Sequence, residues 1–235
     1  MAEQGVETET RVPPIVDMPL FHQSQRFSWD CGISCVMMVL PPQKRAQLLS
    51  NFHDVCSEEG FGKSTWTIDL CYLLKRYQMQ HVYCTITLGV HPGYHGQAFY
   101  DKILHKDEDR VKRRFAEADK YGIVVRQVKL TTEDMVRHLA KSGPIILLTN
   151  ANLLNCEVCK GNRLAMELRN CFPWSISYHG HYIVICGYDY SRQKFSYRNP
   201  AFRNRICVMS FEMMDEARKS YGTDEDAILI HYSWS

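Results

Sequence analysis

Residues 24–35, Ser24-Gln25-Arg26-Phe27-Ser28-Trp29-Asp30-Cys31-Gly32-Ile33-Ser34-Cys35, decide how the chain folds. The residues that follow, 36–40, are apolar and end at Pro41-Pro42, so the pattern predicts a short buried helix that begins at Cys31, with Asp30 as its N-cap. A thiol in the first turn of a helix lies at the positive end of the helix dipole, which lowers its pKa. Cys31 is therefore a candidate nucleophile, although a cysteine considered alone more often packs in a core.

Composition favours a globular protein with a nearly balanced charge. The chain has 235 residues, of which 45% are apolar, and a formal net charge of +2 with the basic residues spread along it. No apolar run reaches the roughly 18 residues that span a bilayer, and the acidic N-terminus is unlike a secretory signal. We expect a cytoplasmic or nuclear protein that binds neither nucleic acid nor membrane, and composition leaves its oligomeric state open.

The pattern of apolar residues predicts one domain. Residues 1–14 are polar and acidic and are expected to form a flexible tail, and residues 15–235 a single domain with a cysteine-containing insertion near 151–178. Periodicity predicts helices at 44–56, 66–77, 107–120, 131–143 and 211–220, and strands at 82–88, 124–130, 144–149, 181–187, 194–198 and 227–232. The charged helix 107–120 is expected to be exposed, with its basic triplet 112–114 on a solvated face.

Four residues can supply the groups that nucleophilic cysteine catalysis needs. Such catalysis uses a thiolate, an imidazole to move its proton, a group to orient the imidazole, and donors for an oxyanion. His181 begins a predicted strand, and Asn199 ends the next strand, so a hairpin brings the two together. Gln25 precedes Cys31 and can donate its side-chain amide over the helix N-terminus. We therefore predict Gln25, Cys31, His181 and Asn199 as the catalytic set.

The same residues resemble the papain-like leader peptidases of bacteriocin exporters. The matching features are Gln25, Asp30-Cys31-Gly32, Gly180-His181-Tyr182 and Asn199-Pro200. In those domains Gln, Cys, His and an Asp act in this chain order, and Asn199 departs from the Asp. The resemblance implies a papain-like α+β fold, with the N-terminal helix packed on an antiparallel sheet. It also implies a thiol hydrolase that cuts a peptide or amide bond in a peptide or protein substrate and requires no cofactor.

The whole chain also resembles the guanylyl cyclase domain-containing protein family. The features that match are residues 29–32, 66–70, 87–90, 180–181 and 221–226. This second resemblance implies formation of cyclic GMP from GTP with magnesium or manganese. The acidic run 224–226 is the tempting metal cluster, but consecutive acids in a turn are more often a solvated loop. We favour the hydrolase, with the cyclase and a non-catalytic adaptor that retains the cleft as alternatives.

A structural zinc site is a further hypothesis. Cys156 and Cys159 have zinc-ligand spacing, with Cys171 as a third ligand and His179 as one choice for the fourth. A second Cys-x-x-Cys pair is missing, so free or loop-stapling thiols remain the alternative. His179 is also an alternative catalytic base. Of the ten cysteines, four lie within apolar stretches and are expected to be reduced core thiols, namely Cys35, Cys71, Cys84 and Cys186.

Overall fold

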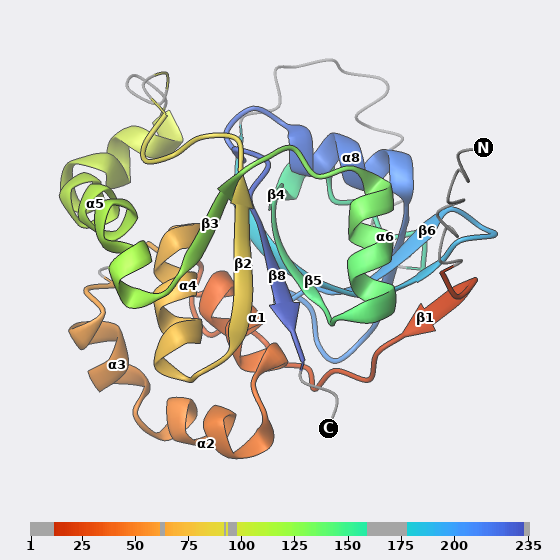
Figure 1. The fold of residues 1–235 in the computed structure, drawn as a ribbon, viewed down its shortest axis with the longest axis horizontal. Coiled ribbons are helices and arrows are strands. Elements are labelled where there is room, and N and C mark those ends of the chain that lie inside the picture. The colour runs from red at the N-terminus through yellow and green to blue at the C-terminus, as the bar shows by residue number, and fades with distance from the viewer. Residues whose placement is uncertain (1–11, 62–63, 92, 94–97, 159–177, 233–235) are drawn as a thin grey trace, which may run out of the picture.

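One mixed sheet forms the centre of the fold. The computed structural model describes residues 12–61, 64–91, 93, 98–158 and 178–232 (Figure 1). In this part of the chain, one eight-stranded sheet is built from β1 (Ile15–Asp17), β2 (Gln80–Thr85), β3 (Val124–Gln127), β4 (Ile145–Asn150), β5 (Gly180–Asp189), β6 (Lys194–Arg198), β7 (Cys207–Ser210) and β8 (Ala227–His231). The strand order is β3-β2-β8-β4-β5-β6-β7, with β1 paired to β5. Only β2 and β3 pair in parallel; the other neighbouring strands are antiparallel.

Helices cover both faces of this sheet. They are α1 (Cys31–Val39), α2 (Pro42–Ser50), α3 (Phe52–Glu58), α4 (Thr67–Arg76), α5 (Ala98–Glu117), α6 (Thr132–Lys141) and α8 (Phe211–Lys219), with short 3-10 turns η2 (Asp119–Tyr121) and η3 (Ala151–Leu153). Helices α1 to α5 lie on one side of β2 and β8, and α6 and α8 lie on the other side (Figure 1). Covered on both faces, β4 is buried along its whole length. The predicted α+β class is confirmed. No helix in the described ranges combines the length and the apolar character that a membrane crossing requires.

Helix α1 is buried at every position, as its apolar sequence requires. It packs closely because Gly32 has no side chain. A Cβ atom at Gly32 would lie 2.8 Å from a methyl group of Leu70 and 3.0 Å from the Tyr182 ring. Any larger residue there would push α1 away from α4 and β5, so Gly32 fixes how Cys31 approaches the sheet.

The predicted element bounds are confirmed in some places and wrong in others. Strand 194–198 agrees with β6, and the predicted helix 66–77 contains α4. The single helix predicted over 44–56 is wrong, because Asn51 leaves the helical region (φ −108°, ψ 23°) and divides it into α2 and α3. Both pieces keep buried apolar residues, Leu48 in α2 and Val55 in α3, and this is why the periodicity looked continuous.

Contacts with the domain begin before residue 15, where we placed the end of the tail. The carbonyl oxygen of Pro13 accepts a hydrogen bond from the Tyr188 hydroxyl at 2.7 Å, and that of Pro14 accepts one from the Tyr190 amide at 2.8 Å. The short β1 that follows was not predicted. Its three residues are too few for an alternating pattern to be recognised.

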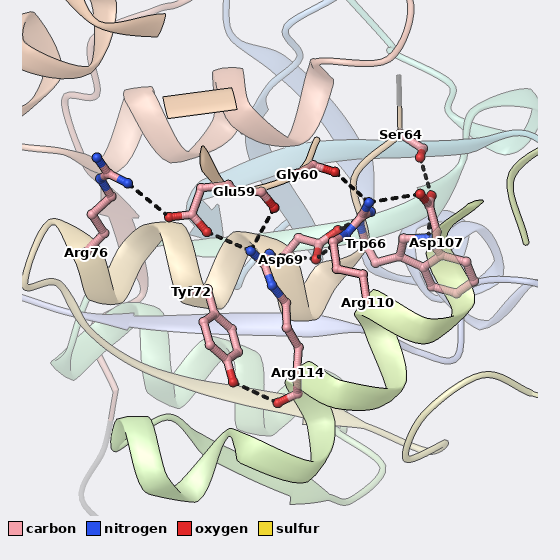
Figure 2. A network of polar contacts seen from close by, with 10 residues as sticks. All are labelled: Glu59, Gly60, Ser64, Trp66, Asp69, Tyr72, Arg76, Asp107, Arg110 and Arg114. Atoms are coloured by element: carbon pink, nitrogen blue, oxygen red, sulfur yellow. Dashed lines mark hydrogen bonds and ion pairs between the residues drawn. The ribbon is translucent and has the colours of Figure 1, made fainter. Parts of the chain in front are cut away.

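The expected exposure of the charged helix 107–120 is wrong for the face that meets α4. Arg114, a member of the basic triplet, is buried and binds Asp69 at 2.6 Å and Glu59 at 2.7 Å. Arg110 binds the same Asp69 at 2.9 Å and also binds Asp107 at 2.9 Å (Figure 2). These charges are buried as paired groups, so an ion-pair network joins the helix to α4 in addition to the apolar contacts of Val111 and Phe115 with the core.

Candidate active site

A cavity of about 250 Å³ opens beside the N-terminal end of α1. Its walls come from the turn before α1, the start of α4, strands β4 and β5, and the loop before β8. The residues that line it are Ser28, Trp29, Cys31, Ser64, Thr65, Trp66, Thr67, Leu148, Tyr178, His179, Gly180, Tyr182, Asp224 and Asp226. Cys31 is thus the described cysteine that lines this cavity.

The thiol of Cys31 is protonated at rest. Burial raises its pKa to about 11, and the negative charge of Asp30 adds to this, while the backbone N–H groups of Tyr182 and Gly32 act in the opposite direction. The predicted lowering of the pKa by the helix start is therefore wrong, because desolvation outweighs the favourable N–H groups. Any chemistry at Cys31 needs a neighbouring base.

Asp30 occupies the predicted N-cap position but does not cap the helix with its side chain. Its carboxylate instead accepts hydrogen bonds from the backbone N–H groups of Arg26, at 3.1 Å, and Phe27, at 3.0 Å. Its carbonyl oxygen accepts the bond from Ser34 at 2.9 Å. The buried carboxylate thereby folds the turn that leads from Gln25 into α1.

His181 and Asn199 form the hydrogen-bonded pair that the hairpin predicts. Nε2 of His181 lies 2.9 Å from Oδ1 of Asn199, and both side chains are buried. The same Oδ1 accepts the backbone N–H of Ala201 at 2.9 Å, which identifies it as the oxygen of the amide. Since that oxygen only accepts, Nε2 carries the imidazole proton and Nδ1 is left with a lone pair. The pair therefore holds His181 in the tautomer that a base requires.

The end of β6 makes room for this pair at the edge of β5. Strand β6 pairs with β5 only as far as Arg198, opposite Val184, while β4 covers the other edge of β5 back to Gly180. Asn199 follows directly after β6. The Cys31 sulfur comes within hydrogen-bonding reach of the Tyr182 backbone N–H, one residue from His181. The structure thus brings Cys31 to the segment of β5 that carries the His–Asn pair.

Burial also lowers the pKa of His181, an effect that the Asn199 hydrogen bond opposes and the charge of His179 strengthens. A lowered pKa keeps the imidazole neutral at pH 7, and a neutral imidazole is the form that accepts a proton. His179 itself lines the cavity, one residue before β5 begins. It remains the alternative base.

Gln25 lies beside the Asn199–Pro200 turn. Its backbone N–H donates to the Pro200 carbonyl oxygen at 2.9 Å, and its side-chain Nε2 donates to the Phe27 carbonyl oxygen at 2.9 Å. This side-chain contact is local, and Gln25 is not among the described residues that line the cavity. Its role as an oxyanion donor stays a prediction.

The predicted zinc site lies mainly outside the described residues. Cys156 is buried, but Cys159 and Cys171 belong to the part of the chain that is not described. Within the described ranges, no group of three or more His, Cys, Asp or Glu side chains is arranged to hold a metal ion. The structural zinc therefore stays a prediction. The core thiols Cys35, Cys71, Cys84 and Cys186 are free and buried, as predicted.

The acidic run 224–226 is not the solvated loop that we predicted. Asp226 is only 6% exposed and lines the cavity together with Asp224. Its pKa is raised to about 7, first by burial and then by the charge of Asp224. Sequence reasoning missed this residue because nothing in three consecutive acids tells which one turns inward. The available signal was their position directly before the apolar strand β8.

The fold and the site together define a class. A buried helix that begins with a cysteine and packs against the antiparallel part of a sheet, beside a His–Asn pair at the end of β5, is the papain-like arrangement, so the chain has a papain-like α+β fold. Among solved structures, xylellain, a cysteine protease from Xylella fastidiosa, is similar at 16% identity and a TM-score of 0.44, covering 94% of this chain and 87% of that protein.

Sequence comparison identifies the family. The family described as guanylylate cyclase matches residues 20–230 of this chain. A relative from Arabidopsis thaliana, named guanylyl cyclase 1, is 35% identical over 233 residues, which cover 98% of this chain and 82% of the relative. The chain therefore belongs to the guanylylate cyclase family.

Proposed function

We propose that the protein is a thiol hydrolase that acts on a peptide or amide bond, with Cys31 as the nucleophile. The observation that supports this most is the hydrogen bond from His181 Nε2 to Asn199 Oδ1, because it leaves Nδ1 of a neutral imidazole able to accept a proton. Asn199 acts as a positioning residue through His181.

The steps follow from the protonation states. His181 takes the proton of the Cys31 thiol as the sulfur attacks the carbonyl carbon, and the carbonyl oxygen becomes negatively charged. Backbone N–H groups at the start of α1, which have no partner within the helix, stabilise that charge. The protonated His181 then gives its proton to the leaving amine as the C–N bond breaks. Water, deprotonated by His181, hydrolyses the resulting thioester and restores the thiol.

Because the thiol of Cys31 is protonated at rest, its reactivity should depend on His181 rather than on a preformed thiolate. We expect iodoacetamide to alkylate Cys31 at pH 7.5 at least about tenfold faster than Cys56, since general bases accelerate proton transfer by this much or more. Cys56 is the matched control, because its pKa is also raised to about 11. His181→Ala should reduce the rate at Cys31 to that at Cys56. Mass spectrometry of each cysteine measures both rates, and equal rates in the unmodified chain would contradict the proposal.

Two variants of Asn199 test its positioning role. Asn199→Leu removes the acceptor for His181 Nε2–H and should lower the alkylation rate of Cys31 about tenfold. Asn199→Asp keeps an acceptor and adds a negative charge that raises the pKa of His181, so the rate should recover while its pH profile moves to higher pH. The pH profile of Cys31 alkylation measures this, and circular dichroism checks that both variants fold. An unchanged rate in Asn199→Leu would show that Asn199 does not act through His181.

A second candidate is guanylyl cyclase activity, which the names of the family and of the Arabidopsis thaliana relative favour. Magnesium or manganese would be the cofactor, and Asp224 and Asp226 are the carboxylates in the cavity nearest to such a role. The test is whether the purified protein forms cyclic GMP from GTP in the presence of manganese. Activity that remains in Cys31→Ser and is lost in Asp224→Asn would favour the cyclase over the hydrolase. A non-catalytic adaptor would show neither cyclic GMP formation nor preferential alkylation of Cys31.

A further inference from the structure

We propose that the cavity beside Cys31 binds one ammonium group of the substrate, with Asp226 as its counter-ion. The inference builds on the proposed hydrolase and names its substrate class: a peptide or amide that carries a positively charged nitrogen beside the bond to be cut. It rests on the burial of Asp226, on the charges that line the cavity, and on the aromatic side chains in its walls.

Asp226 is a buried carboxylate with a vacant acceptor. It is 6% exposed, and its Oδ1 has no hydrogen-bond partner among the described residues. A buried carboxylate oxygen without a donor is costly, and because Asp226 lines the cavity, a ligand bound there can supply a donor. The hydroxyls of Thr67, Thr85 and Tyr83 interact with the carboxylate as hydrogen-bond donors and oppose the rise of its pKa, while Asp224 and the Cys71 thiol also lie near it.

The cavity lining holds two carboxylates and one histidine, His179. Asp224 and Asp226 both line it, and no lysine or arginine is found among its described lining residues. Asp224 is held in place by Thr87, whose hydroxyl donates to Oδ1 of Asp224 at 2.8 Å. A ligand with a positive charge would therefore meet two carboxylates in the cavity, which can offset the loss of its hydration.

The polar tips of the aromatic walls are already used within the protein. Nε1 of Trp66 donates to Asp107 at 3.1 Å, so the network around α5 fixes the indole (Figure 2). The Tyr182 hydroxyl lies 2.8 Å from that of Thr67. Trp29 stacks on Phe27 with ring centroids 5.8 Å apart. The walls therefore offer carbon surface and ring faces, which attract cations.

Size and ligand number favour an organic cation over a metal ion. A volume of about 250 Å³ is below the range of whole small-molecule sites and suits one amino-acid side chain. Calcium and magnesium need about six oxygen ligands or more, and no metal-binding group of three or more side chains is present in the described ranges. An ammonium group needs only a few acceptors.

The raised pKa of Asp226, about 7, agrees with this role. Near neutral pH the carboxyl group is partly protonated, and a bound cation favours the ionised form. Binding of an ammonium group should therefore release a proton near pH 7 and tighten as the pH rises through 7.

Binding to Cys31→Ser protein tests the inference without the nucleophile. Three probes are titrated at pH 8 by calorimetry: Nα-acetyl-lysine methylamide, its neutral counterpart Nα-acetyl-norleucine methylamide, and norleucine methylamide with a free α-amino group. We expect at least one of the two cationic probes to bind about tenfold more tightly than the neutral probe, and the pair distinguishes a side-chain from an N-terminal ammonium. Asp226→Asn should remove this preference, whereas the exposed Asp54→Asn, with the same charge change, should keep it.

The outcomes separate this inference from the proposed hydrolase. Equal affinities for charged and neutral probes, or a preference that survives Asp226→Asn, would overturn the ammonium site even if Cys31 is alkylated preferentially. A charge preference that depends on Asp226, together with no preferential alkylation of Cys31, would support the cation site and overturn the hydrolase. Thermal unfolding of each variant confirms that a lost preference is not a lost fold.

Discussion

Replacement of Asp69 by alanine is expected to lower the free energy of unfolding by about 3–5 kcal/mol, the range for removing one partner of a buried ion pair. Asp69 is fully buried and accepts hydrogen bonds from Arg110, Arg114 and the backbone N–H of Trp66 (Figure 2). Without it, two largely buried guanidinium groups lose their common acceptor. The N-terminus of α4 loses its cap at the same time, because the Trp66 N–H is no longer bonded.

Urea unfolding measures this effect, with Lys112→Ala as the control. Lys112 forms an exposed pair with Glu108 on the same helix, at 2.7 Å, and such surface pairs contribute less than about 1 kcal/mol. A loss below about 1 kcal/mol in Asp69→Ala would mean that Arg110 and Arg114 find other partners. Because Trp66 lines the cavity, the Asp69 variant should also disturb its wall and reduce probe binding.

Helix α5 explains one limit of sequence reasoning. Its residues 107–114 are nearly all charged, three acids followed by basic residues, and a run of charges is also typical of a solvated helix face. Asp107 and Arg114 are buried where α5 meets α4, and α4 supplies Asp69 as a partner. The apolar periodicity that predicted the helix over 66–77 gives no information about the partners of Asp69. A charge pattern predicts that a helix forms, but the partners of its charged side chains depend on packing between segments that are far apart in the chain.

The candidate site likewise contains features that the sequence predicts and features that depend on tertiary packing. His181 and Asn199 could be predicted to meet because a hairpin joins them, and the hydrogen bond between them confirms it. The protonation of Cys31 could not be predicted, because it depends on how deeply the helix start is buried. Asp226 was missed for the same physical reason, since its inward orientation depends on the tertiary contacts of one loop.

The raised pKa of Asp226 also predicts how the free energy of unfolding depends on pH. The folded protein raises its pKa from 3.8 to about 7, so the folded state holds the proton more tightly than the unfolded chain between these values. Stability from this group is therefore greatest at low pH and decreases as the pH rises toward 7. At about 1.4 kcal/mol for each pKa unit, the full decrease is roughly 4 kcal/mol.

Asp226→Asn removes the titrating group, so the variant should be more stable than the unmodified chain at pH 8, by up to about 4 kcal/mol, and this advantage should fade toward pH 4. Urea unfolding at several pH values between 4.5 and 8 measures the difference, and Asp54→Asn should show no such trend. Equal stability at pH 8 would mean that the carboxylate is well solvated or paired when ionised. At neutral pH the buried carboxyl group of Asp226 lowers the stability of the protein without a ligand. Such a loss of stability is expected for a binding site for a cationic substrate, because the bound ammonium group would stabilise the ionised carboxylate and offset the loss.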